Sequence, residues 1–172
     1  MPATPDDLFA MLDRFGIAHV TAHHPAVFTV AESGGVREQV AGAHTKNLFL
    51  KDKRGALFLV VACEDATIAL KALHRVIGAT GRLSFGSAEQ LDAHLGVAPG
   101  SVTPFSAIND HAGHVTVVLD AAMMTHDVLN FHPLINTMTT TIARDGLVTF
   151  LEATGHVPRI VALTSDDRSA GD

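Results

Sequence analysis

Three short segments of this 172-residue chain carry side chains whose types and spacing could do chemistry. In the first, Lys46 and Asn47 stand at the entrance to the apolar run Leu48-Phe49-Leu50. A lysine at a strand entrance, beside an amide side chain, could bind a phosphate or a carboxylate. The alternative is an ordinary solvated lysine with no ligand.

The second segment is the stretch 96–105, which holds two glycines and two prolines. Such loops can present backbone N–H and C=O groups to a ligand, and the candidates here are Gly96, Pro99, Gly100 and Ser101. A plain turn between a helix and a strand would use the same residue types.

The third segment is a proline turn that places His132 between Asn130 and Asn136. A lone histidine in such a turn is usually bonded within the turn or exposed.

The eleven histidines raise the question of a metal. The close pairs are His23-His24 and His111-x-x-His114, and neither stands with a carboxylate in a recognised ligand pattern. The sequence also lacks a phosphate-binding loop, a dinucleotide fingerprint and a nucleophile elbow. We therefore expect no metal and no cofactor. The single cysteine, Cys63, excludes a disulfide framework and is expected to be buried and inert.

The charge of the chain is unevenly distributed. The net charge is −6, but residues 37–82 hold eight basic and four acidic side chains, and the remainder therefore carries −10. Local potential governs the binding of an anion more than total charge does. Because Tyr and Trp are absent, a platform that stacks several bases is not expected. An RNA partner would be held by its end, with an affinity that falls only shallowly with salt.

The helices and strands that must position these residues are predicted from the periodicity of apolar residues and from turn and capping residues. We expect a hairpin around residues 52–55, a turn at 111–114 and a polar tail over 164–172. The expected fold class is α/β, with a mixed, mostly antiparallel sheet surrounded by helices in one domain over residues 1–163. The expected helices cover 6–15, 67–77, 87–95 and 145–153, with a short one within 29–40, and the expected strands cover 17–21, 47–51, 56–63, 82–85, 115–119, 126–131, 137–143 and 160–163.

No secretory signal is visible, and the longest apolar run, residues 56–63, is too short to cross a bilayer. We therefore expect a cytoplasmic protein with neither a membrane nor DNA as partner.

In order and spacing, the three segments resemble the YbaK/prolyl-tRNA-synthetase-associated editing domain family over roughly residues 5–163. The segments that carry the resemblance are 45–52, 96–104 and 130–137. The likeness is closest to the free-standing branch that removes alanine from proline tRNA. It implies a deacylase that hydrolyses an aminoacyl ester at the 3′ end of tRNA(Pro), with transient contact with prolyl-tRNA synthetase.

The resemblance also implies roles for residues. Lys46 and Asn47 would be catalytic, with Lys46 on the phosphate backbone and Asn47 on the aminoacyl group or terminal ribose. His132 would shape the amino-acid pocket, the loop residues Gly96, Pro99, Gly100 and Ser101 would line it, and Phe28 and Thr29 would border it. In this family the terminal 2′-hydroxyl of the tRNA is thought to assist the attacking water, so positioning would carry much of the rate. The alternatives are a cysteinyl-tRNA(Pro) deacylase, a tRNA- or synthetase-binding module without activity, and a metalloenzyme that uses the histidines.

Overall fold

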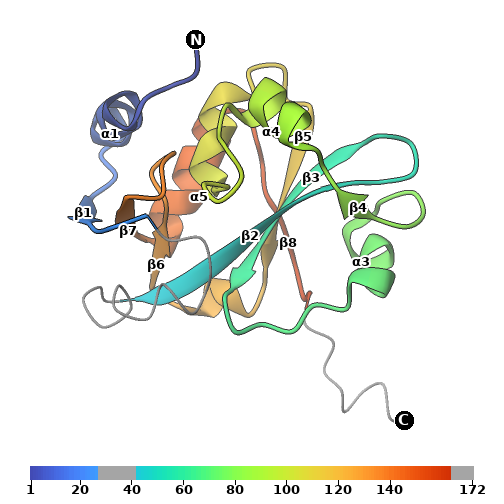
Figure 1. Cartoon of the computed structure of the whole chain (residues 1–172). Helices are drawn as coiled ribbons and strands as arrows, with labels where there is room; N and C mark the ends of the chain where they lie inside the picture. Colours follow the sequence, from blue (N-terminus) through green and yellow to red (C-terminus); the bar gives the residue numbers. More distant parts are fainter. Residues whose placement is uncertain (27–41, 164–172) are drawn as a thin grey trace.

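A sheet of eight strands frames the molecule in residues 1–26 and 42–163, the part of the chain that the computed structural model describes (Figure 1). The order is β1-β7-β6-β2-β3-β5-β8, and β4 pairs with β2 beside this path. Four of the seven strand pairings are antiparallel, which confirms the expected mixed α/β fold. The strands are β1 (His19–His23), β2 (Ala43–Lys51), β3 (Leu57–Cys63), β4 (Ser84–Phe85), β5 (Val115–Asp120), β6 (Val128–Phe131), β7 (Met138–Ala143) and β8 (Arg159–Val161).

The hairpin between β2 and β3 forms at the expected place because Asp52 organises the turn. Its carboxylate accepts backbone N–H bonds from Arg54, Ala56 and Thr80, each at 2.9 Å. These bonds, that from Thr80 foremost, lower the pKa of Asp52 even though burial acts to raise it. The turn is thereby tied to the segment that follows α3 (Leu70–Ile77).

The two faces of the sheet are covered unequally. One face packs against α1 (Pro5–Arg14), α4 (Ala88–Leu95), α5 (Arg144–Ala153) and the 3₁₀ helix η1 (Pro104–Asn109), and it forms the larger core cluster. The other face packs against α3, which lies at the opposite end of the sheet from α1 (Figure 1). A second 3₁₀ helix, η2 (Met123–Thr125), follows β5. In the described ranges, no helix is long and apolar enough to cross a membrane.

The helix boundaries agree with the sequence where capping residues are present. Thr4 with Asp7 and Ser87 with Gln90 form capping boxes at α1 and α4. Helix α3 begins at Leu70, three residues later than expected, and has no side-chain cap. The backbone carbonyl of Ala66, which could have closed a first helical turn, instead accepts a hydrogen bond from Lys46.

Four other expectations differ from the structure. Strand β1 lies two residues further along the chain than expected, β2 begins at Ala43 rather than 47, and β4 is only two residues long. The expected loop 96–105 ends in η1, whose cap is the Thr103 side chain accepting from the Phe105 N–H. The helix expected within 29–40 and the tail 164–172 lie outside the described residues.

Candidate functional site

Strand β2 changes neighbours along one edge, and the candidate residues lie where it does so. It pairs with β6 in parallel at Ala43 and His44, and with β4 at Leu50 and Lys51. Between these pairings, residues 45–49 have strand partners in the described sheet only in β3, although the Phe49 carbonyl also accepts from the Gly86 N–H at 2.9 Å. We call this interval the β2 gap. Lys46 and Asn47 both lie in it.

Lys46 and Asn47 leave β2 on opposite faces of the sheet, because successive strand residues point in opposite directions. Leu48 packs against the smaller core, on the α3 side, and Phe49 belongs to the larger core. Lys46 therefore projects to the α3 side, where its Nζ donates to the carbonyl of Ala66. Asn47 projects to the side of α4 and α5. The two residues are adjacent in the gap, but their side chains lie on opposite faces of the sheet and do not meet.

Two buried polar side-chain atoms of β2, close to Lys46 in the sequence, have no hydrogen-bond partner among the described residues. They are Asn47 Oδ1 and His44 Nε2, and only two further side-chain atoms in residues 1–26 and 42–163 share this state. Buried polar atoms are normally paired, so an unpaired one needs an explanation. Asn47 Oδ1 can only accept, which suits a ligand N–H or O–H group.

His132 follows the end of β6, beside the gap. Ala43 pairs with Leu129 and His44 with Asn130, so His132 and Lys46 each lie two residues beyond the last paired position of their segments. Its Nδ1 lies 3.1 Å from the carbonyl of Met138. A carbonyl only accepts, so Nδ1 carries the hydrogen.

Burial lowers the pKa of His132, and the neighbouring His24 acts in the same direction, while the bond to Met138 opposes them. The neutral ring therefore keeps Nε2 as an acceptor. The His24 ring lies 6.3 Å from that of His132, and its Nε2 is 2.8 Å from Thr139 Oγ1. In the sequence, His24 stands out only as the neighbour of His23. No local spacing links His24 to His132, which is 108 positions away.

Backbone strain marks the turn that carries His132. Leu134 has a φ of 74° and is the one non-glycine residue with positive φ in the described part of the chain. Its side chain is buried in the larger core. Strained residues persist where the surrounding packing over-determines them, and they cluster at functional sites.

The loop candidates are divided between two environments. Gly96 ends α4 in the left-handed conformation, with a φ of 64°, and a Cβ there would lie 2.8 Å from Asn109 and 2.9 Å from Pro2. Pro99 and Gly100 are exposed, whereas Ser101 is buried and its N–H donates to the Ala98 carbonyl at 3.0 Å. The structure thus gives Gly96 a packing role at α4 and exposes the loop at Pro99 and Gly100.

The end of this loop is fastened close to His132. Phe105 packs edge-on against Phe131, with ring centroids 5.7 Å apart. Phe131 is the residue before His132 and points to the same face as Asn47. Phe28 and Thr29, the remaining candidates, lie outside the described residues.

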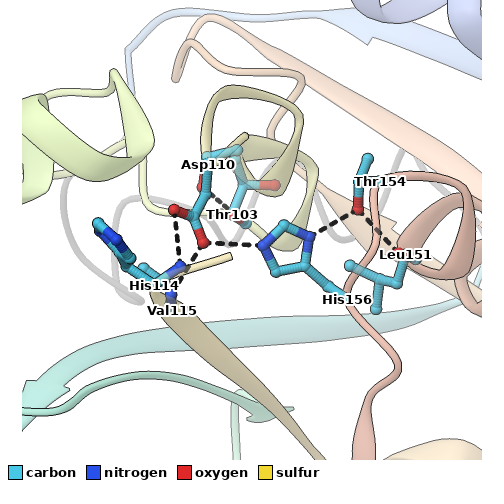
Figure 2. A network of polar contacts seen from close by, with 8 residues as sticks. Thr103, Asp110, His114, Val115, Leu151, Thr154 and His156 are labelled. Atoms are coloured by element: carbon cyan, nitrogen blue, oxygen red, sulfur yellow. Dashed lines mark hydrogen bonds and ion pairs between the residues drawn. The ribbon is translucent and has the colours of Figure 1, made fainter. Parts of the chain in front are cut away.

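A second buried polar cluster lies between η1, β5 and the end of α5, and we call it the Asp110–His156 network (Figure 2). Asp110 Oδ2 accepts from His156 Nε2 and from the Val115 N–H, both at 2.8 Å, and Oδ1 accepts from the His114 N–H at 3.1 Å. Burial acts to raise the pKa of Asp110, but these bonds, that from His156 foremost, outweigh it and lower the pKa.

The other side of the His156 ring is also bonded. Thr154 Oγ1 lies 2.8 Å from the Leu151 carbonyl, to which it can donate, and 2.9 Å from His156 Nδ1. Both nitrogens of the buried His156 ring therefore have a hydrogen-bond partner, and the network joins Asp110 to the end of α5.

Comparison with known proteins places the chain in a family. Residues 24–150 match the model of the aminoacyl-tRNA editing domain, and the chain belongs to this family. It is 37% identical over 159 residues to a Xenopus laevis protein named prolyl-tRNA synthetase associated domain-containing protein 1, covering 90% of this chain and 94% of the relative.

A second relative is the prolyl-tRNA editing protein ProX of Acetoanaerobium sticklandii, 32% identical over 157 residues, with 91% of this chain and 95% of the relative covered. Among solved structures, a candidate trans-editing enzyme for prolyl-tRNA synthetase superposes with a TM-score of 0.67 at 16% identity, over 94% of this chain and 99% of the other. This last likeness concerns the fold.

Proposed function

We propose that the protein hydrolyses the ester bond of alanyl-tRNA(Pro), releasing alanine and free tRNA. Support comes from the family and from the relative named as a prolyl-tRNA editing protein, whose length the chain covers to 95%. The observation that carries the proposal is the β2 gap, which holds Lys46 and the buried, unpartnered Oδ1 of Asn47.

The chemistry needs no protein nucleophile. Water adds to the ester carbonyl, and the O3′–C bond then breaks, with the proton passing to the leaving 3′-oxygen. Lys46 binds a phosphate near the 3′ end as a point charge, and to do so it exchanges its bond to Ala66 for the phosphate. Asn47 Oδ1 accepts from the amino group of alanine or a hydroxyl of the ribose. Holding the reacting groups in a near-attack geometry supplies the acceleration.

The placement of Lys46 and Asn47 constrains how the substrate lies. Because the two side chains project to opposite faces of the sheet, a substrate that uses both must lie across β2 at the gap. His132, which follows the end of β6 beside the gap, would then form one wall for the amino acid. The exposed part of the loop at Pro99 and Gly100 would cover the face of Asn47.

The size of the amino acid must be the basis of selection. A synthetase site shaped for proline rejects a smaller amino acid by only about 1–3 kcal/mol per missing methylene, so a second hydrolytic site is needed. A site that admits alanine and excludes proline provides it. Cysteine is close to alanine in size, and a cysteinyl-tRNA(Pro) deacylase is the alternative that the test must separate.

The test is a deacylation panel with tRNA(Pro) carrying alanine, cysteine, serine or proline. We expect the highest kcat/KM with alanine and about a hundredfold loss or more in Lys46→Ala, since a charge-assisted phosphate contact is removed. Lys71→Ala is the matched control, because Lys71 is an exposed lysine of α3. Preference for cysteine would overturn the alanine assignment. Full activity in Lys46→Ala would remove Lys46 from the site.

A further inference from the structure

His94, Asp110 and His114 form a cluster outside the β2 gap. One ligand atom of each lies within 4.8 Å of the others, and this is the one such group of three or more found in residues 1–26 and 42–163. His94 is in the last turn of α4, Asp110 ends η1, and His114 precedes β5. The rings of His94 and His114 meet edge-on, with centroids 5.5 Å apart. Figure 2 shows Asp110 and His114 side by side.

Asp110 keeps bonding capacity on the side of these histidines. Oδ2 already accepts two hydrogen bonds, from His156 and Val115, whereas Oδ1 accepts one, from the His114 N–H. A carboxylate oxygen has two lone-pair sites, so Oδ1 has one left. The bonds to Oδ2 also fix the orientation of the carboxylate, as outer partners do for metal ligands in proteins.

We propose that His94, Asp110 and His114 bind a borderline divalent cation such as Zn²⁺, independently of the proposed deacylase function. Two imidazole nitrogens and one carboxylate oxygen suit Zn²⁺, with water as the fourth ligand, and are a poor set for Mg²⁺ or Ca²⁺. Ligands about 2.0 Å from a tetrahedral zinc lie roughly 3.3 Å apart. The cluster must therefore contract, and the exposed His114 ring can rotate to close it.

The position of the site gives the cation a structural consequence. Between His94 and Asp110 the chain forms the loop 96–103 and η1. A cation bound to both residues would link the two ends of this segment. The ends are already joined by the hydrogen bond from Asn109 Nδ2 to the Leu95 carbonyl at 2.8 Å. Binding is therefore expected to stabilise the fold.

The test is titration of metal-stripped, tag-free full-length protein with Zn²⁺, followed by calorimetry and thermal unfolding. We expect saturable binding at one ion per chain and a Tm increase of roughly 5 °C or more at a hundredfold excess over Kd. His94→Gln and His114→Gln should each weaken binding at least about tenfold and abolish most of the Tm increase. Both variants should have the unfolding temperature of the wild type without metal, because neither side chain is in the core.

His111→Gln is the matched control, since His111 is exposed in the same turn and is the partner that sequence spacing offers to His114. It should bind Zn²⁺ as the wild type does. The proposal is overturned if binding is not saturable at one ion per chain, if His94→Gln binds normally, or if His111→Gln loses binding as His114→Gln does. Replacing Zn²⁺ by Mg²⁺ should give no heat of binding, and equal affinity for both would also contradict it.

Discussion

The β2 gap and the Asp110–His156 network are both polar and buried in part, but they use their hydrogen-bonding capacity differently. In the network, Asp110 accepts three bonds and both nitrogens of His156 are bonded (Figure 2). At the gap and next to it, Asn47 Oδ1 and His44 Nε2 have no hydrogen-bond partner among the described residues. An unpaired buried polar atom costs about 1–3 kcal/mol, so the gap gives up stability that the network retains.

This difference separates groups that hold the fold from groups that face a ligand. The residues of the network come from three distant segments and join η1, the start of β5 and the end of α5. Their pairing is complete within the chain apart from one lone pair on Asp110. The polar atoms of the gap lie instead where, in the described sheet, β2 pairs with neither β6 nor β4. We expect substitutions in the network to change stability and substitutions in the gap to change activity.

The largest effect is expected for Asp110→Ala. It leaves the buried His156 Nε2 and the N–H groups of His114 and Val115 without their acceptor, and because each buried group left unpaired costs about 1–3 kcal/mol, we expect a loss of roughly 3 kcal/mol or more. Urea unfolding at pH 7 measures the loss, and Asp110→Asn serves if the alanine variant does not fold. The exposed His111→Ala in the same turn should stay within about 0.5 kcal/mol of the wild type. A loss below about 1 kcal/mol for Asp110→Ala would show that the network does not hold these segments.

The second-largest effect is expected for Gly96→Ala, which tests whether Gly96 stabilises the fold or contacts the substrate. Gly96→Ala forces a Cβ into the left-handed conformation and against Asn109 and Pro2, so we expect a loss of about 2–4 kcal/mol. Gly55→Ala is the matched control, with a φ of 86° but no atom within 4 Å of its Cβ, and it should cost only about 1–2 kcal/mol. Deacylation by the folded Gly96→Ala protein should be close to normal. A selective loss of kcat/KM at unchanged stability would instead assign Gly96 to the substrate.

The sequence predicts much of this fold because its signals are local. The β2–β3 hairpin follows from turn residues between two apolar runs, and the capping boxes at Thr4 and Ser87 mark their helices. The β2 gap could not be predicted, since it depends on the pairing of Ala43 with Leu129 and of Leu50 with Phe85. These partners are set by tertiary packing rather than by neighbouring residues.

In the two sites, one feature could have been predicted from the sequence and another depends on tertiary packing. Alternation along a strand already implies that Lys46 and Asn47 point to opposite faces, so their separation could have been predicted from the sequence. In contrast, His114 suggested His111 as its partner because the two are close in sequence, whereas the structure places it beside His94 and Asp110. The distance between helix α4 and the turn before β5 is fixed only by the folded core.

A smaller effect, on activity, is expected for Asn47→Ala. Its Oδ1 has no bond to lose in the free protein, so stability should change by less than about 1 kcal/mol, while kcat/KM for alanyl-tRNA(Pro) should fall about tenfold. Thr45→Val is the matched control on the same face of β2, because Thr45 Oγ1 donates to the Asn130 carbonyl at 2.7 Å. It should lose about 1 kcal/mol of stability and little activity. The opposite pattern would contradict the division between the two regions.

The smallest expected effect is that of His132→Gln on the pH dependence of the free energy of unfolding. Burial lowers the pKa of His132 below its ordinary value of 6.5, so between that value and the folded pKa the unfolded chain binds more protons than the folded one. The contribution of His132 is therefore fully present above pH 6.5 and is lost as the pH falls below it. His132→Gln cannot titrate, so its free energy of unfolding should fall less steeply between pH 7.5 and 5.5 than that of the wild type. Parallel urea titrations measure both slopes, and equal slopes would mean that His132 is as accessible to protons in the folded protein as in the unfolded chain.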